Sequence, residues 1–182
     1  VVPLAAALRR RQAARLGLPS LEFHDEALEF LSGNPEPLGG AAGIVANGLS
    51  MFAAMSAETG AFFRLLSERG LYDLETRKGK AAGGYCSYLP TERMPYIFAN
   101  FNGTAEDVDT FSHECGHAFQ VYRSGLAARG VPDYDWPTLE ACEIHSMGME
   151  FLAWPWMDSF FGKDAAKYRF RHLCAGILFL PY

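Results

Sequence analysis

The stretch TFSHECGHAFQ, at residues 110–120, carries two histidines four positions apart with a glutamate directly after the first. On an α-helix such positions lie about 40° apart around the axis, so the imidazoles of His113 and His117 can point at one metal ion. Neutral imidazole nitrogens are good zinc ligands, and a carboxylate beside them can reach a water molecule on the metal. The sequence therefore predicts a zinc site on a helix, with His113 and His117 as ligands and Glu114 as the group that activates the water.

The apolar residues around this motif indicate which side of the helix is buried. They form one stripe, nearly opposite the two histidines, that comprises Val108, Phe111, Cys115, Phe119 and Tyr122. Cys115 is therefore expected to point away from the metal and not to bind it. Gly116 is roughly 1 kcal/mol less favourable than alanine inside a helix, so we expect another backbone, such as a strand, to pass close to it.

A catalytic zinc ion usually has three protein ligands and one open position, so a third ligand is needed. The segment PTLEACEIHSMGMEF, at residues 137–151, offers carboxylates. In a helix Glu143, Ser146 and Glu150 share one face, because they are spaced three and four residues apart. We therefore predict Glu143 as the third ligand, with Ser146 and Glu150 holding the ligand side chains in place.

The other polar residues of this segment are weaker candidates. His145 lies about 200° around the helix from Glu143 and would face elsewhere, and Glu140 does not share the face of Ser146. Ile144, Gly148 and Phe151 form a separate apolar side. A solvated acidic face is the alternative interpretation of these carboxylates, but the upstream HExxH favours a ligand role for Glu143.

Propensity and turn residues predict a mainly α fold with one small antiparallel β-sheet. A short helix capped by Asp25 is expected to run to Phe30, and the long helix at 41–68 is expected to break near Gly60. Pro155 is expected to kink or end the last helix. The expected elements are helices at 4–16, 41–68, 105–125 and 138–160, a loop at 32–40, and two strands within 79–102 joined by LPTERMP.

Composition limits the class of protein. The chain has 182 residues, 49% of them hydrophobic, and a net charge of −5 that gives no basic surface for nucleic acid. It shows neither a membrane-spanning run nor a signal peptide, so we expect a cytoplasmic protein without a membrane partner. Four cysteines without a CxxC pair are expected to be free thiols, and they are Cys86, Cys115, Cys142 and Cys174.

The segments HECGH at 113–117 and EIHSMGME at 143–150 resemble the HExGH and ExxSxxxE patterns of the thimet oligopeptidase and oligoendopeptidase F family. The stretch GKAAGGYCSYLPTERMPYIFANFNG at 79–103 is also similar to that family. This resemblance implies a zincin-like helical metallopeptidase core with a deep channel, one zinc ion per chain and oligopeptide substrates. It gives His113, His117 and Glu143 the role of ligands and Glu114 that of general base.

The resemblance also implies that Gly83, Gly84 and Tyr85 belong to an edge strand that pairs with the substrate backbone. In the family, a histidine and tyrosines that stabilise the reaction intermediate follow the region that corresponds to this chain. We therefore expect residues 1–182 to be a single catalytic-core segment of a longer helical peptidase, of unknown oligomeric state. The predicted activity is that of a zinc metalloendopeptidase; the alternatives are a zinc carboxypeptidase and a zinc-binding helical module without catalysis.

Overall fold

A computed structural model describes residues 1–127 and 131–179, with the side chains of the second range described to residue 176. The fold is mainly helical with one small sheet, as predicted. The described α-helices are α1 (Val2–Leu16), α2 (Gly40–Met55), α3 (Ala57–Glu68), α4 (Glu106–Ala127), α5 (Leu139–Leu152), α6 (Met157–Phe161) and α7 (Ala165–Leu173). The described strands are β1 (Tyr72–Glu75), β2 (Tyr85–Leu89) and β3 (Met94–Phe101).

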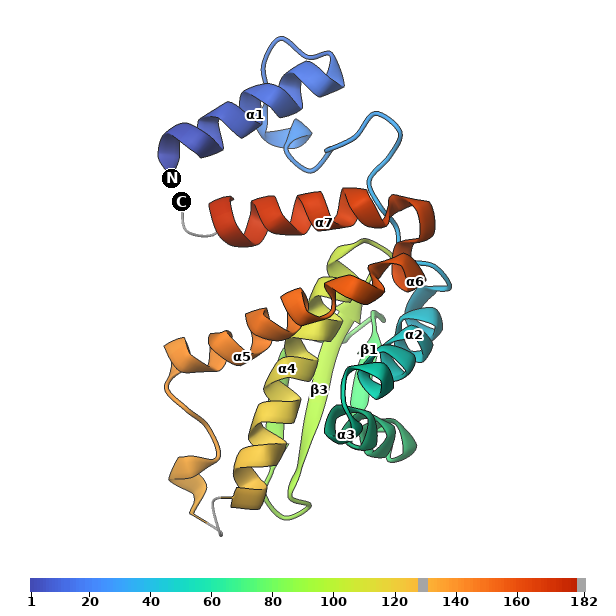
Figure 1. The fold of residues 1–182 in the computed structure, drawn as a ribbon, viewed down its shortest axis with the longest axis vertical. Coiled ribbons are helices and arrows are strands. Elements are labelled where there is room, and N and C mark those ends of the chain that lie inside the picture. The colour runs from blue at the N-terminus through green and yellow to red at the C-terminus, as the bar shows by residue number, and fades with distance from the viewer. Residues whose placement is uncertain (128–130, 180–182) are drawn as a thin grey trace.

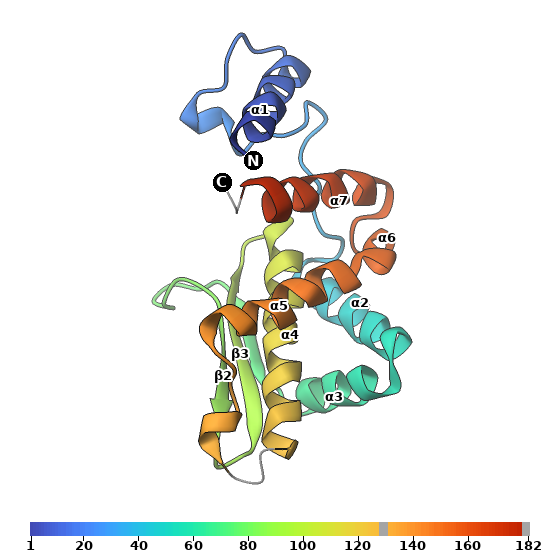
Figure 2. The same cartoon turned by 60° about the vertical axis from the view of Figure 1, so that its left-hand side comes forward.

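The helix α4 is the centre of the fold. It runs along β3, and α5 crosses it (Figure 1). Figure 2 shows α2 and α3 on the opposite side of α4 from β2, while α1 and α7 lie at the far end from α3. Residues of the sheet, of α4 and of the α2–α3 pair form one buried cluster, so the core surrounds the helix that carries the HExxH motif.

The sheet has the strand order β1-β3-β2 and is mixed, not antiparallel throughout. The predicted hairpin of β2 and β3 is present, with Tyr85 opposite Phe98 and Leu89 opposite Met94. The third strand, β1, was not predicted and runs parallel to β3. Its sequence, YDLE, contains two carboxylates and only one buried residue, so it lacks the apolar alternation that would identify a strand.

The long helix predicted at 41–68 is broken at Ser56 and not at Gly60. Ser56 has extended backbone angles, and its hydroxyl accepts a hydrogen bond from the backbone N–H of Thr59 at 3.1 Å, which caps α3. Gly60 lies inside α3, where a Cβ would come within 2.8 Å of the Cα of Ala53. The glycine therefore allows the backbones of α2 and α3 to approach each other and does not interrupt the helix.

The helix predicted from Asp25 to Phe30 is absent. A 3₁₀ turn at Phe23–Asp25 takes its place, and the Asp25 carboxylate accepts a hydrogen bond from the backbone N–H of Glu22 at 3.0 Å. Asp25 thus caps the turn before it instead of a helix after it. The prediction at Pro155 is confirmed, because α5 ends at Leu152 and Pro155 lies in a 3₁₀ turn at Trp154–Trp156.

Gly116 is the point at which α5 crosses α4. A Cβ on this residue would lie 2.7 Å from both the carbonyl oxygen of His145 and the Cα of Ser146. The expectation that another backbone passes close to Gly116 is therefore confirmed, but that backbone belongs to a helix and not to a strand. Because Gly116 has no side chain, α5 can approach α4 closely at this point, and the position of the glycine determines which residues of the two helices face each other.

We expect Gly116→Ala to destabilise the fold by about 1–3 kcal/mol, because the added methyl group would overlap backbone atoms of α5 that cannot rotate away. Gly148→Ala is the matched control, since Gly148 lies in α5 and a methyl group added there would meet no other part of the described chain within 4 Å. That change is expected to be neutral or to stabilise the helix by up to ~1 kcal/mol. Denaturant unfolding measures both, and equal midpoints for the two variants would contradict the close crossing.

Candidate metal centre

The start of α4 is anchored to the end of β3. The buried carboxylate of Asp107, in the first turn of the helix, accepts hydrogen bonds from the backbone N–H groups of Asn102 and Gly103 at 3.0 and 2.8 Å. Further along, Val108, Phe111 and Cys115 are buried in the core, and Phe119 and Tyr122 pack against it. The predicted apolar stripe therefore faces the core, and it fixes the rotation of α4 that turns its histidines toward α5.

Side-chain atoms of His113, His117 and Glu143 converge on one point. The Glu143 Oε2 atom lies 3.2 Å from His113 Nε2 and 3.7 Å from His117 Nε2. One ligand atom from each residue falls within 4.8 Å of the others. The centroids of the two imidazole rings are 4.8 Å apart, and the ring planes make an angle of 82°. Two imidazole nitrogens and one carboxylate oxygen at these separations are a donor set for a divalent metal ion, and the structure brings together the three residues that the sequence singled out.

Ser146 and Glu150 hold two of these three side chains. The fully buried hydroxyl of Ser146 donates to Glu143 Oε2 at 2.7 Å. Glu150 lies one turn further along α5, and its Oε1 atom is 2.6 Å from His113 Nδ1. A histidine that donates its Nδ1–H to a carboxylate keeps the Nε2 lone pair free for a metal, so Glu150 presets His113 for binding.

The charges of the site follow from this arrangement. Burial lowers the pKa of His113, but the hydrogen bond to Glu150 and the charge of Glu150 outweigh burial and leave it raised. For His117, burial and then the neighbouring His113 lower the pKa. His117 Nδ1 is buried and has no hydrogen-bond partner among the described residues. The two histidines thus differ at Nδ1: among the described residues, a carboxylate contacts this atom in His113 but not in His117.

Glu114 lies beside the convergence point and is 7% exposed. Burial raises its pKa to about 7; the charge of His113 opposes this shift and that of Glu143 adds to it. Among the described residues, no group forms a hydrogen bond with its carboxylate. A buried carboxylate with free oxygens and a pKa near neutrality is suited to accept and return a proton.

A glycine loop passes directly beside Glu114. A Cβ on Gly84 would lie 3.3 Å from the Cγ2 atom of Thr110, a tight contact, and 3.6 Å from Glu114 Oε1, an ordinary one, so the loop backbone passes within contact distance of the carboxylate. Gly83 has a positive φ of 94°, and Tyr85 begins β2 with its ring stacked on Phe98 at 4.9 Å. Because β2 is an edge strand of the sheet, its outer backbone groups face away from β3.

Lys80 holds this loop against the sheet. Its side chain is 2% exposed, and its ammonium donates to the carbonyl oxygens of Asp73, Glu75 and Ala99 at 3.0, 2.9 and 2.5 Å. Asn100 donates to the carbonyl oxygens of Ala81 and Gly83 at 2.9 and 2.8 Å. The loop that carries Gly83 and Gly84 is therefore tied to β1 and β3 from both sides.

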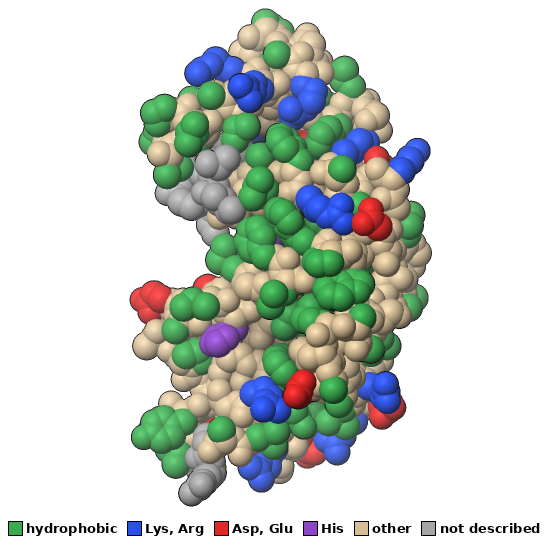
Figure 3. Space-filling view, viewed as in Figure 1, with side chains coloured by type: hydrophobic (Ala, Val, Ile, Leu, Met, Phe, Trp, Pro, Cys, Tyr) green, Lys and Arg blue, Asp and Glu red, His purple; other side chains and the backbone are tan. Residues whose placement is uncertain are grey.

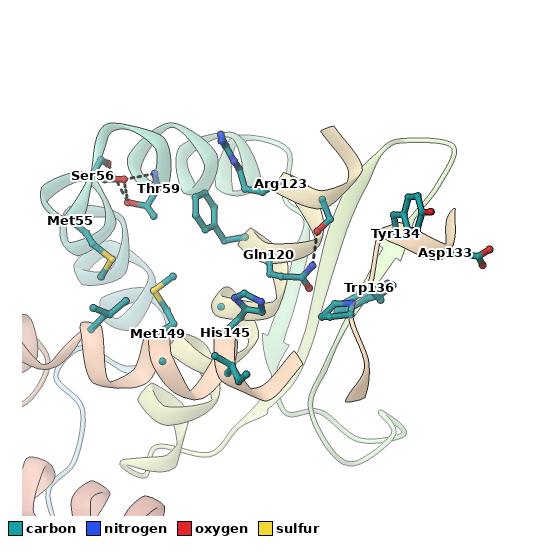
Figure 4. A pocket seen from close by; sticks show the side chains of 17 residues that line it. Met55, Ser56, Thr59, Gln120, Arg123, Asp133, Tyr134, Trp136, His145 and Met149 are labelled. Carbon is teal, nitrogen blue, oxygen red and sulfur yellow. Dashed lines mark hydrogen bonds between the residues drawn. The ribbon is translucent and has the colours of Figure 1, made fainter. Parts of the chain in front are cut away.

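A pocket of about 830 Å³ lies next to the metal centre. It lies between α3, α4 and α5, and Figure 4 shows Met149 and His145 extending into it from α5, with Trp136 and Tyr134 at its other end. None of His113, Glu114, His117 and Glu143 lines it. The two sites adjoin, because the ring of Trp136, which lines the pocket, lies 6.3 Å from the ring of His117.

The apolar side predicted for α5 is not its buried side. Ile144 is 71% exposed and lines the pocket with Gly148. Figure 3 shows hydrophobic side chains grouped over and beside α5 on one face of the molecule. The residues that α5 buries are Cys142, Ser146 and Met149. The face with Cys142, Ser146 and Met149 is buried because the α5 backbone contacts α4 at Gly116. The distribution of hydrophobic residues along α5 does not predict this.

Two further residues near the site were not predicted. His172, on α7, places its Nε2 atom 2.5 Å from Glu150 Oε2, and Trp154 Nε1 donates to His172 Nδ1 at 2.9 Å. Neither residue has a sequence spacing that relates it to HExxH.

The cysteines are free thiols, as predicted.

The chain belongs to a known family of metallopeptidases, Peptidase family M3, whose profile matches residues 59–166. It is 54% identical to a PZ peptidase A solved with an inhibitor, with a TM-score of 0.96, and the match covers 100% of this chain and 32% of that one. A protein from Bacillus anthracis str. Ames, provisionally assigned as an oligoendopeptidase F, is 53% identical with the same TM-score, over 100% of this chain and 33% of that one.

The fold alone is shared with a Chlamydophila abortus protein provisionally assigned as a peptidase, at 20% identity and a TM-score of 0.63, over 98% of this chain and 31% of that one. The chain thus spans about a third of the length of these solved structures. No curated protein sequence matches it. Within the described residues, no helix combines the length and apolarity that a membrane crossing requires.

Proposed function

We propose that this chain forms the catalytic core of a zinc metalloendopeptidase that hydrolyses peptide bonds in oligopeptides. The observation that carries the proposal is the convergence of His113, His117 and Glu143 on one point, with the buried Glu114 carboxylate beside it. Membership of a metallopeptidase family supports the reaction class. The proposal that the substrates are oligopeptides follows the provisional assignment of the Bacillus anthracis protein as an oligoendopeptidase F.

The donor set fits zinc in a catalytic site better than in a structural one. Structural zinc sites are closed by four protein ligands and are rich in cysteine, whereas catalytic sites have three ligands and one open position. Here the converging atoms are two nitrogens and one oxygen, and Cys115 is buried on the core side of α4. This favours an enzyme over a zinc-binding module without catalysis.

When bound, the zinc ion supplies a Lewis acid that polarises the scissile carbonyl and makes a water molecule more acidic. Glu114 then acts as the general base that takes the proton of this water and afterwards delivers it to the leaving amine. Its burial favours this role, because a pKa near 7 lets one carboxyl group both accept and donate a proton near neutral pH.

The substrate is proposed to lie along the outer edge of β2. Gly84 lies beside the Glu114 carboxylate, and Tyr85 begins the edge strand, so a peptide paired with this strand would pass the metal centre. Main-chain hydrogen bonds of this kind do not depend on side chains, which suits an enzyme that cleaves varied peptides. Lys80 and Asn100 would hold the edge in position.

The experiment that tests the proposal is digestion of a mixed peptide library by the zinc-loaded full-length protein, with products identified by mass spectrometry. An endopeptidase gives products cut at internal bonds of peptides whose two ends are blocked. Release of single C-terminal residues from unblocked peptides only would replace the proposal by a carboxypeptidase, and no cleavage of any peptide would favour the module without catalysis.

We expect Glu143→Ala to lower zinc affinity by more than about 100-fold, because it removes one of three ligands. Glu140→Ala is the matched control: both glutamates are exposed on α5, but only Glu143 faces the two histidines. The control should bind zinc within about threefold of the unchanged protein. Chelator competition measures both affinities, and a larger loss for Glu140→Ala would show that the ligand has been assigned to the wrong glutamate.

A further inference from the structure

A chain of polar contacts continues behind the metal centre into α7. Glu150 uses both of its carboxylate oxygens: Oε1 lies 2.6 Å from His113 Nδ1, and Oε2 lies 2.5 Å from His172 Nε2. Trp154 Nε1 lies 2.9 Å from the remaining ring nitrogen of His172, Nδ1. The four side chains therefore form a continuous line from Trp154 through His172 and Glu150 to the proposed ligand His113.

The tryptophan sets the direction of every hydrogen bond in this line. An indole N–H can only donate, so His172 Nδ1 must accept and carries no proton. The proton of the His172 ring is then on Nε2, where it is donated to Glu150 Oε2. Since Glu150 has only acceptors to offer, His113 must donate from Nδ1, which leaves its Nε2 lone pair facing Glu143 and His117.

The surroundings of His172 keep this ring in one place. It is 3% exposed and lies between aromatic rings. The ring of Tyr168 is stacked on it, with a centroid distance of 5.7 Å and an interplanar angle of 9°, and the centroid of the Phe151 ring lies 4.8 Å away. The helix α7 that carries it is tied to α4, because Tyr168 Oη donates to Asp109 Oδ1 at 2.6 Å and Arg171 Nη1 donates to Asp109 Oδ2 at 2.8 Å. Asp109 is one turn before His113 on the same helix.

We infer that His172 is a positioning residue of the metal centre, acting through Glu150 on His113. This inference rests on the proposed function, since it assumes that His113 binds zinc. Without the His172 N–H, one oxygen of the mostly buried Glu150 carboxylate would lack a donor, and the carboxylate could rotate away from the orientation that holds His113. Trp154 serves the same purpose one step further out, by keeping the His172 proton on Nε2.

Two amide substitutions separate this role from packing. The amide nitrogen of glutamine can reach the position of histidine Nε2, so His172→Gln keeps the donor to Glu150. The shorter asparagine reaches only the position of Nδ1, so His172→Asn keeps the contact with Trp154 and loses that donor. We expect His172→Asn to lower zinc affinity about 10- to 100-fold and His172→Gln to stay within about threefold of the unchanged protein.

The readouts are zinc affinity from chelator competition in the intact protein, the visible absorption spectrum of the cobalt-substituted protein, and thermal unfolding of the zinc-free form. The inference predicts a changed cobalt spectrum for His172→Asn alone. It is overturned if His172→Asn binds zinc as the unchanged protein does, or if the two variants lose equal affinity. If the unchanged protein itself binds no zinc, the proposed function fails, and this inference fails with it.

A second measurement does not require any variant at His172 to fold. Long-range ¹H–¹⁵N spectra of the zinc-free protein report which nitrogen of each histidine ring carries the proton. We expect a proton on Nε2 of His172 and a bare Nδ1, with a larger share of the opposite tautomer in Trp154→Phe. A proton on Nδ1 of His172 in the unchanged protein would overturn the inference whether or not zinc binds.

Discussion

Replacing Glu114 by glutamine is expected to leave zinc bound and to lower kcat/KM by about 100-fold or more. Glutamine has nearly the same shape as glutamate, but its amide cannot accept a proton from water. Glu114 lies beside the proposed ligands without being one of the converging donors, so metal content should not change. Burial raises the pKa of the Glu114 carboxyl group to about 7, so it can accept a proton and return it near neutral pH, which a glutamine amide cannot do.

The measurement is kcat/KM on one quenched-fluorescence peptide, with metal content determined on the same samples. Glu140→Gln is the control, because Glu140 is exposed on α5 and takes no part in the proposed site. It should retain full activity. If Glu114→Gln kept its turnover within about threefold of the unchanged protein, another group would have to be the base.

Removing either imidazole ligand is expected to have the second large effect, on metal content. The unchanged protein should hold about one zinc ion per chain, and His113→Ala or His117→Ala should lose it on dialysis, because two ligands cannot retain the ion against water and chelators. His145→Ala is the matched control: His145 is also a histidine of the α4–α5 region, but it lines the pocket on another side of α5.

Metal analysis after dialysis compares the three variants. The control should keep its zinc, and thermal unfolding of the zinc-free proteins should show that the variants remain folded. His117→Ala is expected to lose zinc as completely as His113→Ala, although only His113 has a carboxylate behind it. Full metal content in both ligand variants would rule out the site.

The metal centre was largely predictable because its residues are close in sequence and lie on helices. Spacings of four residues in α4 and of three and four in α5 place side chains on one face whatever the rest of the fold does. These spacings grouped His113 with His117 and placed Glu143 with Ser146 and Glu150, as the structure does. The roles of these residues in binding and catalysis remain predictions.

The features that were missed depend on contacts between distant segments. The strand β1 exists through parallel pairing with β3, which its own charged sequence does not indicate. The buried face of α5 is set by the crossing at Gly116, so the apolar side that contains Ile144 is not the face that the helix buries. His172 reaches Glu150 from α7, a helix that is held against α4 by contacts such as that of Arg171 with Asp109.

A zinc titration of peptide hydrolysis shows whether the site formed by His113, His117, Glu143 and Glu114 needs zinc to cleave peptides. The protein is first freed of metal with a chelator, and activity on one quenched-fluorescence peptide is followed as zinc is added back. We expect no hydrolysis in the metal-free protein, a rise in proportion to added zinc, and a plateau at about one zinc ion per chain. Hydrolysis that persists at the full rate after the metal has been removed would contradict this expectation.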